Sequence, residues 1–254
     1  MISKNKIKYI RSLELKKNRT AEGLFVAEGP KVVGDLMPTM RLRYVVATES
    51  WLKANQTTIP AEVEVFDVTE EELRKVSYLQ TPQEVLAVFE IPGSNASSAA
   101  EFPKEKLSLA LDGVQNPGNL GTIIRIADWF GIENIYCSPE TADVYNPKVV
   151  QATMGSIARV KVEYGDLLGL ITSLPSEEPV YGTLLDGDNI YEQSLENHGF
   201  IVMGNEGKGI SPALAKKVNH RLLIPNFPDG RPTADSLNVA IATAITCSEF
   251  RRRK

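Results

Sequence analysis

Short apolar segments alternate with longer, more polar segments along most of this chain, and that alternation restricts the possible folds more than any other feature. In the C-terminal half the apolar segments lie at 107–111, 135–137, 180–183, 200–203 and 222–224. Each is short enough for a buried strand, and the segments between them are long enough for helices that connect one strand to the next. This order predicts an α/β unit whose sheet is mainly parallel.

The N-terminal half shows the same alternation on a smaller scale. Its predicted strands are the apolar segments at 24–27, 44–47, 63–66 and 85–91. Ser3 and Thr69 are predicted to cap helices, the second in a capping box with Glu72. Alternating helices and strands again predict a small α/β domain.

The composition changes between the two halves. Residues 92–106 are small, polar and proline-containing, with no periodicity, which predicts a linker. We therefore predict a first domain at 1–91 and a second at 107–254.

Charge is distributed unevenly along the chain. The formal net charge is −4, yet residues 1–19 contain seven basic side chains and one acidic side chain, Glu14, a local balance of 7 − 1 = +6. The last four residues, 251–254, are also basic. Such clusters suit contacts with RNA phosphates even in an acidic protein. A solvated helix face and a frayed tail explain the same charges equally well, so charge alone leaves both interpretations open.

Several kinds of protein and site are disfavoured by the sequence. No apolar run approaches the roughly 20 residues of a membrane-spanning helix, and the basic N-terminus lacks the apolar stretch of a secretory signal. The two cysteines, Cys137 and Cys247, have no zinc-like spacing and are interpreted as reduced thiols. We therefore expect a cytoplasmic protein with no membrane segment and no metal.

Three polar or glycine-rich segments each follow a predicted strand of the second domain, where ligands of open α/β sheets bind. In the first, at 112–121, Asn119 is the predicted helix start and Arg125 falls six residues later. An arginine at that position can hold a phosphate through two hydrogen bonds. On spacing alone, an exposed arginine paired with Asp128 is the favoured interpretation.

The second segment, 203–209, reads Met-Gly-Asn-Glu-Gly-Lys-Gly. It is not a P-loop, because glycine follows Lys208, and it is not a dinucleotide fingerprint, because the last required glycine is Pro212. An ATPase or a dehydrogenase is therefore unsupported. A glycine-rich turn that carries the carboxylate of Glu206 remains.

The third segment, 222–238, leads into an apolar helix at 239–250. Ser236 is the predicted N-cap of this helix. Its predicted buried stripe consists of Leu237, Ile241, Ala244 and Ile245. Helix capping alone would explain the Ser-Leu-Asn sequence at 236–238 if this segment stood by itself.

Taken together, the three segments resemble the motifs of the SpoU family, part of the SPOUT superfamily of RNA ribose 2'-O-methyltransferases. In chain order the matches are Asn119-x-Gly121-x-x-x-Arg125, Gly204-Asn205-Glu206-Gly207-x-Gly209, and Ile224-Pro225 followed by Ser236-Leu237-Asn238. The segment 149–156 matches a further signature of the family. Lys16-Lys17-x-Arg19 and the segment 25–29 resemble the family's ribosomal-protein-like substrate-binding domain.

This resemblance implies a parallel sheet that ends in a C-terminal trefoil knot, and a homodimer whose sites are completed at the subunit interface. It implies S-adenosylmethionine as the cofactor, held near Thr183, Leu184, Gly204, Ile224 and Leu237.

The family's catalytic residue falls on Arg125, which promotes attack of a ribose 2'-hydroxyl on the methyl group. The resemblance implies that the catalytic arginine and the substrate are positioned by Asn119, Glu206, Ser236 and Asn238. Because a guanidinium stays protonated, we expect orientation and electrostatic stabilisation rather than simple base catalysis.

The chain departs from the family pattern near the expected cofactor pocket. Residues 226–235 form an insertion, and Asp235 stands where glutamate is common, so the geometry of the pocket rim is left open. Trp129 and Phe130, which follow Arg125, are expected in the core. Tyr9 among the N-terminal lysines is expected either to pack or to stack on RNA.

The resemblance predicts an RNA methyltransferase, with ribosomal RNA the favoured substrate because the N-terminal domain is basic, and transfer RNA second. A non-catalytic RNA-binding or ribosome-assembly factor with this fold is an alternative of another class, against which the retained Asn119, Arg125 and Glu206 argue. A metabolic nucleotide-binding enzyme is a third class, disfavoured by the absent phosphate-loop patterns.

Overall fold

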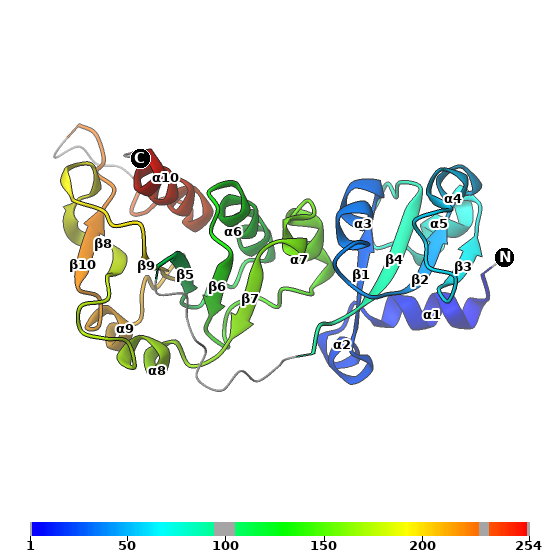
Figure 1. Ribbon diagram of the computed structural model, residues 1–254, viewed down its shortest axis with the longest axis horizontal. Coiled ribbons are helices and arrows are strands. Elements are labelled where there is room, and N and C mark those ends of the chain that lie inside the picture. Colours follow the sequence, from blue (N-terminus) through cyan, green and yellow to red (C-terminus); the bar gives the residue numbers. More distant parts are fainter. Residues whose placement is uncertain (1, 94–104, 229–233, 253–254) are drawn as a thin grey trace. The chain divides into compact units, whose positions relative to one another are not determined.

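The structure is a computed structural model that describes residues 2–93, 105–228 and 234–252 (Figure 1). Most of the predicted linker, part of the predicted insertion and the last two basic residues lie outside the described residues.

The chain is divided into two compact units. The first comprises Met1–Ser97 together with Asp143–Ala158, and the second comprises Ser98–Ala142 together with Arg159–Lys254. A segment from the C-terminal half of the sequence therefore belongs to the first unit.

The first unit contains a mixed four-stranded sheet in the order β1-β4-β2-β3, in which β2 and β3 are parallel and the other pairs are antiparallel. The strands are β1 (Leu24–Glu28), β2 (Leu42–Ala47), β3 (Glu64–Asp67) and β4 (Val85–Glu90), which confirms the four predicted strands. The helices are α1 (Lys4–Ser12), α2 (Lys16–Glu22), α3 (Pro30–Leu36), α4 (Glu49–Asn55), α5 (Glu70–Val76), α7 (Pro147–Ala152) and the 3-10 turn η1 (Ser156–Ala158). Ser3 and Thr69 form the predicted helix caps.

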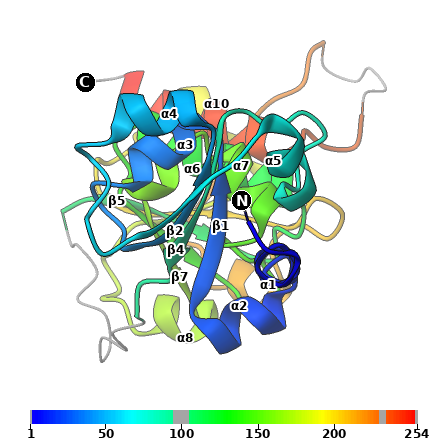
Figure 2. The same ribbon diagram turned by 90° about the vertical axis from the view of Figure 1, so that its right-hand side faces the viewer.

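Alternate residues of β1 face two different helical layers. Leu24 and Val26 pack with Ile10 and other buried side chains of α1 and α5 in one apolar cluster. Phe25 stacks on Phe89 of β4, with ring centroids 5.8 Å apart. Helices α1 and α5 lie on one side of β1, and α3 and α4 on the other (Figure 2). The unit is thus a sheet between two helical layers, as its alternating sequence predicts.

The second unit contains a six-stranded sheet in the order β10-β8-β9-β5-β6-β7, with every neighbouring pair parallel. The strands are β5 (Leu107–Leu111), β6 (Asn134–Cys137), β7 (Lys161–Tyr164), β8 (Val180–Asn189), β9 (Gly199–Met203) and β10 (His220–Leu223). The predicted parallel sheet and its five predicted strands are confirmed. The edge strand β7 was not predicted, because its sequence, Lys-Val-Glu-Tyr, contains no apolar run.

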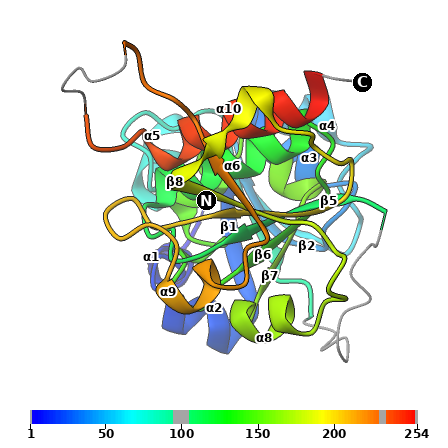
Figure 3. The ribbon, with the colours of Figure 1, turned by 90° about the vertical axis from the view of Figure 1, so that its left-hand side faces the viewer.

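Helices cover both faces of this sheet. They are α6 (Pro117–Trp129), α8 (Leu167–Thr172), α9 (Pro212–Ala215), α10 (Val239–Arg252) and the 3-10 turn η2 (Ile190–Glu192). Helices α6 and α10 lie on one side, and α8 and α9 on the other (Figure 3). On the second side, Phe200 and Val202 of β9 pack with Leu167 and Leu214. The sheet is therefore buried on both faces, which explains its continuous apolar strands.

Helix α10 is the apolar C-terminal helix predicted from the sequence, but its buried stripe differs from the prediction. The buried side chains include Val239, Thr243, Thr246 and Phe250. Leu237 is 49% exposed and Ile241 is 53% exposed, so the predicted stripe is wrong for both. Neither α10 nor any other helix in the described ranges is long and apolar enough to cross a membrane.

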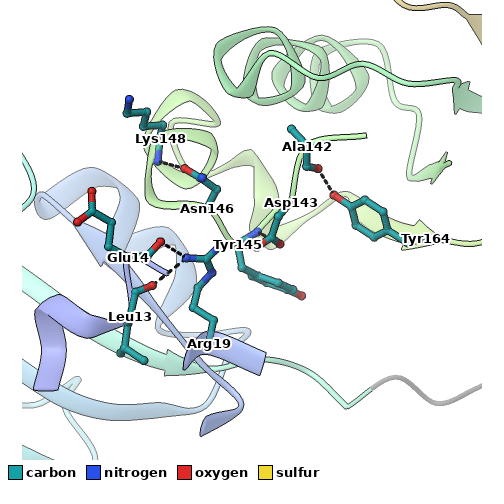
Figure 4. Close-up of polar contacts among 9 residues, drawn as sticks. All are labelled: Leu13, Glu14, Arg19, Ala142, Asp143, Tyr145, Asn146, Lys148 and Tyr164. Atoms are coloured by element: carbon teal, nitrogen blue, oxygen red, sulfur yellow. Dashed lines mark hydrogen bonds and ion pairs between the residues drawn. The ribbon is translucent and has the colours of Figure 1, made fainter. Parts of the chain in front are cut away.

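A buried arginine holds the segment Asp143–Ala158 within the first unit. Arg19 of α2 is 2% exposed and donates hydrogen bonds to the carbonyl oxygens of Leu13 and Glu14 and to the carboxylate of Asp143 (Figure 4). The sequence places Arg19 in the basic cluster of residues 1–19, for which RNA contact and a solvated helix face were both left open. Neither applies to Arg19, because its guanidinium is buried and bound to oxygen atoms of the unit itself.

Candidate active site

The loops that carry the first two predicted segments meet at one edge of the parallel sheet. Strands β5 and β9 are paired in parallel, so their carboxyl ends reach the same edge. The side-chain amide of Asn205, after β9, donates to the carbonyl oxygen of Gly113, after β5, at 2.7 Å. The carboxylate of Asp112 accepts from the backbone N–H of Ser211 at 2.7 Å. The two loops therefore hold each other in place where ligands of such sheets bind.

Asn116 begins helix α6. Its side-chain oxygen accepts hydrogen bonds from the backbone N–H groups of Gly118 at 2.8 Å and Asn119 at 3.2 Å, and Pro117 is the first helical residue. The predicted start at Asn119 is therefore wrong. Asn-Pro is the stronger signal, since proline at the first helical position leaves no backbone N–H unpaired.

Asn119, placed inside the first turn of α6, connects all three segments through its side-chain amide. Its nitrogen donates to Oε1 of Glu206 at 2.7 Å, and its oxygen accepts from the side-chain amide of Asn238 at 3.0 Å. An amide with its donor on a carboxylate and its acceptor on another amide has a fixed orientation. Three of the five predicted catalytic or positioning residues thus lie in one hydrogen-bonded chain.

Asn238 is also the cap of α10. Its side-chain oxygen accepts from the backbone N–H groups of Ala240 at 3.0 Å and Ile241 at 3.3 Å. The prediction of Ser236 as the cap is wrong, because the amide of Asn238 satisfies the first N–H groups of the helix. Ser236 is exposed and forms no hydrogen bond with the residues that the structure describes.

The loop after β9 is a tight turn that depends on glycine. The side-chain oxygen of Asn205 accepts from two backbone N–H groups within the loop, at 2.9 and 3.0 Å, and the backbone of Asn205 pairs with that of Gly209. A side chain at Gly204 would place its Cβ 2.2 Å from the carbonyl carbon of Gly209, where no Cβ fits. The turn therefore fixes Glu206 opposite α6.

Arg125 lies on the exposed face of α6. The residues that form this face, at helical spacing, are Gly118, Thr122, Arg125 and Trp129. Within the described ranges, Arg125 has no hydrogen bond or ion pair, and the partner predicted from spacing, Asp128, binds Arg159 at 2.7 Å instead.

Trp129 is 85% exposed, so the prediction that it belongs to the core is wrong. It lies at the solvent-facing end of the helix, whereas Phe130 is half-buried.

Four of the five predicted cofactor residues lie in or just after three neighbouring strands at one side of the sheet, and the fifth, Leu237, lies just before α10. Thr183 and Leu184 are in β8, just past its pairing with β9. Gly204 follows β9, Ile224 follows β10, and Leu237 precedes α10. Strands β10, β8 and β9 are neighbours in that order, so Thr183, Leu184, Gly204 and Ile224 belong to adjacent strands.

Three backbone N–H groups at these positions are available to a ligand such as S-adenosylmethionine. The N–H groups of Gly204, Ile224 and Leu237 donate to none of the described residues. The nitrogen atoms of adenine and the carboxylate of the methionyl group are suitable acceptors. Leu184 and Ile224 are half-buried and Leu237 is half-exposed, which provides apolar contacts for an adenine ring.

Three residues that organise the site lie in the predicted segments but were given no role from the sequence. Asn116 has a recognisable signal, because Asn-Pro marks a helix start. Asn205 also has one, because asparagine before glycine favours a turn closed by its own side chain. Asp112 has none, since its acceptor role depends on Ser211, 99 residues away.

Comparison with known families agrees with this arrangement. The profile of the SpoU rRNA Methylase family matches residues 106–248, more than half of the chain. The chain belongs to the SpoU family. In addition, the profile of the MRM3-like substrate binding domain matches residues 4–87, which covers most of the first unit.

Individual relatives of this SpoU protein are similar over nearly its whole length. The 23S rRNA (guanosine(2553)-2'-O)-methyltransferase RlmP of Bacillus subtilis is 31% identical over 252 residues, 97% of this chain and 96% of the relative. A solved structure described as an RNA methyltransferase of the TrmH family, from Porphyromonas gingivalis, is 44% identical, with a TM-score of 0.87 and complete coverage of both chains. The AdoMet-bound rRNA methyltransferase of Sinorhizobium meliloti is 30% identical, with a TM-score of 0.87, and the match covers 100% of this chain and 96% of that one.

The family, the relatives and the fold confirm the activity predicted from the three motifs. This SpoU protein is an RNA 2'-O-ribose methyltransferase that uses S-adenosylmethionine. A non-catalytic factor and a metabolic nucleotide-binding enzyme, the two alternatives of other classes, are accordingly not supported.

Proposed function

We propose that this SpoU methyltransferase modifies ribosomal RNA, with transfer RNA as the second candidate. The proposal is supported by the 31% identity, over 97% of the chain, to an enzyme named for its action on 23S rRNA. The observation that carries the catalytic part is the hydrogen-bonded chain of Asn238, Asn119 and Glu206, which joins the three motifs at the ligand-binding edge of the sheet.

In this proposal Arg125 is the catalytic residue. Its guanidinium is exposed and permanently charged, so it can hold an RNA phosphate beside the reacting ribose and stabilise charge that develops as the 2'-hydroxyl attacks. Asn119, Glu206 and Asn238 fix the loops around it, and the exposed hydroxyl of Ser236 contacts the substrate. As a cation, the guanidinium orients the substrate and stabilises developing negative charge rather than removing the proton.

We assign the cofactor to the edge formed by β8, β9 and β10. When bound, S-adenosylmethionine supplies an electrophilic methyl group. The backbone of Gly204, Ile224 and Leu237 holds its polar atoms, and Thr183 and Leu184 line the same edge. The hydroxyl of Thr183 is held by the carbonyl oxygen of Val202 at 3.4 Å, which keeps this part of β8 against β9.

We also propose that the end of the second unit forms the trefoil knot of the family. Close backbone approaches are consistent with a threaded chain. A Cβ at Gly187 of β8 would lie 2.6 Å from the carbonyl carbon of Leu222 in the neighbouring strand β10. Glycine at position 187 lets β8 and β10 approach more closely than a side chain there would allow.

A homodimer is part of the proposal. Trp129 at the end of α6 is 85% exposed, Leu237 just before α10 is 49% exposed, and Ile241 in the first turn of α10 is 53% exposed. Exposed apolar side chains of this kind mark interaction surfaces. Because Arg125 shares the exposed face of α6 with Trp129, a second copy covering this face would complete the surroundings of Arg125.

The proposal places the enzyme in the cytoplasm, with its RNA and its cofactor. Cys137 and Cys247 are buried and free, which suits a reducing compartment.

Methyl transfer from labelled S-adenosylmethionine to total RNA from cells lacking the protein tests the proposed substrate and the role of Arg125. Label in ribosomal RNA with the native enzyme, reduced at least about 100-fold by Arg125→Ala, is the expected result. Label in transfer RNA would transfer the assignment to the second candidate. No label from a folded, cofactor-binding enzyme would contradict the proposal.

A further inference from the structure

The structure separates the basic side chains of residues 2–19 into two groups. Arg19 is buried, Lys6 pairs with Glu64 at 2.8 Å, and Arg11 donates to the carbonyl oxygen of Ser77 at 2.7 Å. The other group consists of Lys4, Lys8, Lys16 and Lys17. These four lysines are exposed and have no hydrogen bond or ion pair to any described residue.

The remaining basic side chains of residues 20–93 are all used in ion pairs. Four of them pair with a glutamate or aspartate one helical turn away, and the other two pair with Glu90. These six residues are Lys31, Arg41, Arg43, Lys53, Arg74 and Lys75. Unpaired positive charge within residues 2–93 is therefore concentrated on α1 and α2, which follow one another along one side of the unit (Figures 1 and 2).

The placement of these lysines does not stabilise the helices that carry them. Lys4 is the first residue of α1 and Lys16 the first of α2, and neither helix has an acidic residue in its first turn. By contrast, α4 and α5 begin with glutamates. Lys4 and Lys8 are one turn apart on the exposed face of α1, where like charges destabilise a helix by about 0.2–0.5 kcal/mol. Folding alone does not explain this arrangement.

Helix α2 carries Glu22, and Glu14 lies between α1 and α2, but five other acidic side chains of the unit gather in one cleft away from these helices. A cleft of about 970 Å³ is lined by Glu49, Asp67, Glu70, Glu72 and Glu84, with Arg74 as its basic member. A polyanion is repelled there and attracted to the unpaired lysines.

We propose that Lys4, Lys8, Lys16 and Lys17 form the docking surface for the sugar-phosphate backbone of the substrate RNA. The inference rests on the proposed function, since it takes RNA as the substrate, and adds the face through which the first unit holds it. Lysines on flexible stems contact phosphates without reading bases, so this surface supplies affinity and leaves sequence selection to other groups.

The test compares two variants of the full-length enzyme with the same net charge. One replaces Lys4, Lys8, Lys16 and Lys17 by glutamine, and the control replaces Lys31, Lys53, Arg74 and Lys75 by glutamine. Filter binding to unmodified 23S rRNA made by transcription gives Kd over a series of potassium chloride concentrations, and methyl transfer gives KM and kcat. Far-ultraviolet circular dichroism and cofactor binding verify that both variants are folded.

The four-lysine variant is expected to bind RNA at least about tenfold more weakly, with the slope of log K against log salt reduced by about 3, because each lost phosphate contact removes about 0.7. Its KM should rise with kcat little changed, and the control should stay within about threefold of the native enzyme. Equal losses in both variants, or no loss in either, would overturn the inference while the proposed function stands. Failure of the native enzyme to bind RNA would overturn both.

Discussion

Replacing Asp143 by asparagine should strongly destabilise the first unit. The guanidinium of Arg19 is 2% exposed, and its Nε atom already has no hydrogen-bond partner. Asp143→Asn keeps the side-chain size and an oxygen for the backbone N–H of Tyr145, but removes the acidic partner of Arg19 (Figure 4). Breaking one side of a buried ion pair costs about 3–5 kcal/mol. Because Asp143 is itself 17% exposed, we expect a loss of about 3 kcal/mol.

Urea denaturation monitored by the fluorescence of Trp51 measures this loss. Trp51 is buried in the first unit, and the only other tryptophan of the chain, Trp129, lies in the second unit and is removed by a Trp129→Phe background. With a slope of about 2 kcal/mol per molar urea, the midpoint should fall by about 1.5 M. The double variant Arg19→Met/Asp143→Leu should recover part of the loss, since it leaves no charge buried.

Glu64→Gln is the control, because it breaks an ion pair of the same unit in which Glu64 is 52% exposed. An exposed pair contributes about 0–1 kcal/mol. If Asp143→Asn lowers the urea midpoint no more than Glu64→Gln does, the buried Arg19–Asp143 pair contributes no more to stability than an exposed pair, and the reasoning is refuted.

Three further predictions concern the second unit. Gly204→Ala should weaken S-adenosylmethionine binding in calorimetry and destabilise the unit by about 1–3 kcal/mol, because its Cβ would collide with the backbone of Gly209. The control Gly207→Ala, where a Cβ fits, should change neither quantity. A Gly204→Ala enzyme with native cofactor binding and stability would contradict the assigned role of this turn. Trp129→Glu should halve the mass measured by light scattering, whereas an unchanged dimer would exclude this face as the interface. Burial raises the pKa of Cys137 and Cys247 to about 12, so neither thiol should react with a disulfide reagent in the native protein. The free energy of unfolding should fall from about pH 9 toward pH 12, because the thiols ionise in the unfolded chain before they do so in the folded protein. A thiol that reacts rapidly in the native protein would be inconsistent with this packing.

Much of the fold could be predicted from the sequence, because burial on both faces of a parallel sheet produces continuous apolar strands. The errors occurred where a local signal had a close competitor. Ser236 and Asn238 are both good caps, and the amide of Asn238 caps α10 while also reaching Asn119. Asn116 and Asn119 competed in the same way, and Pro117 identifies the correct helix start.

The rest depended on contacts between residues far apart in the chain. Arg19 has the sequence environment of an RNA-binding arginine, and its burial depends on Asp143, 124 residues away. Trp129 has the residue type of a core position, yet the turn of α6 leaves it 85% exposed beside Arg125 on the helix face. No local pattern contains that information, because helical periodicity gives the spacing of a face and not which face is buried.

The central claim is methyl transfer to a ribose 2'-hydroxyl of ribosomal RNA by the site around Asn119 and Arg125. The most direct measurement is alkaline hydrolysis of 23S rRNA that the enzyme has labelled with methyl groups. A 2'-O-methyl group blocks alkaline cleavage at its own nucleotide, so the label should appear in alkali-resistant dinucleotides, and Arg125→Ala should abolish it. Label in mononucleotides would show methylation of a base, and equal labelling by Arg125→Ala would show that this arginine is not catalytic.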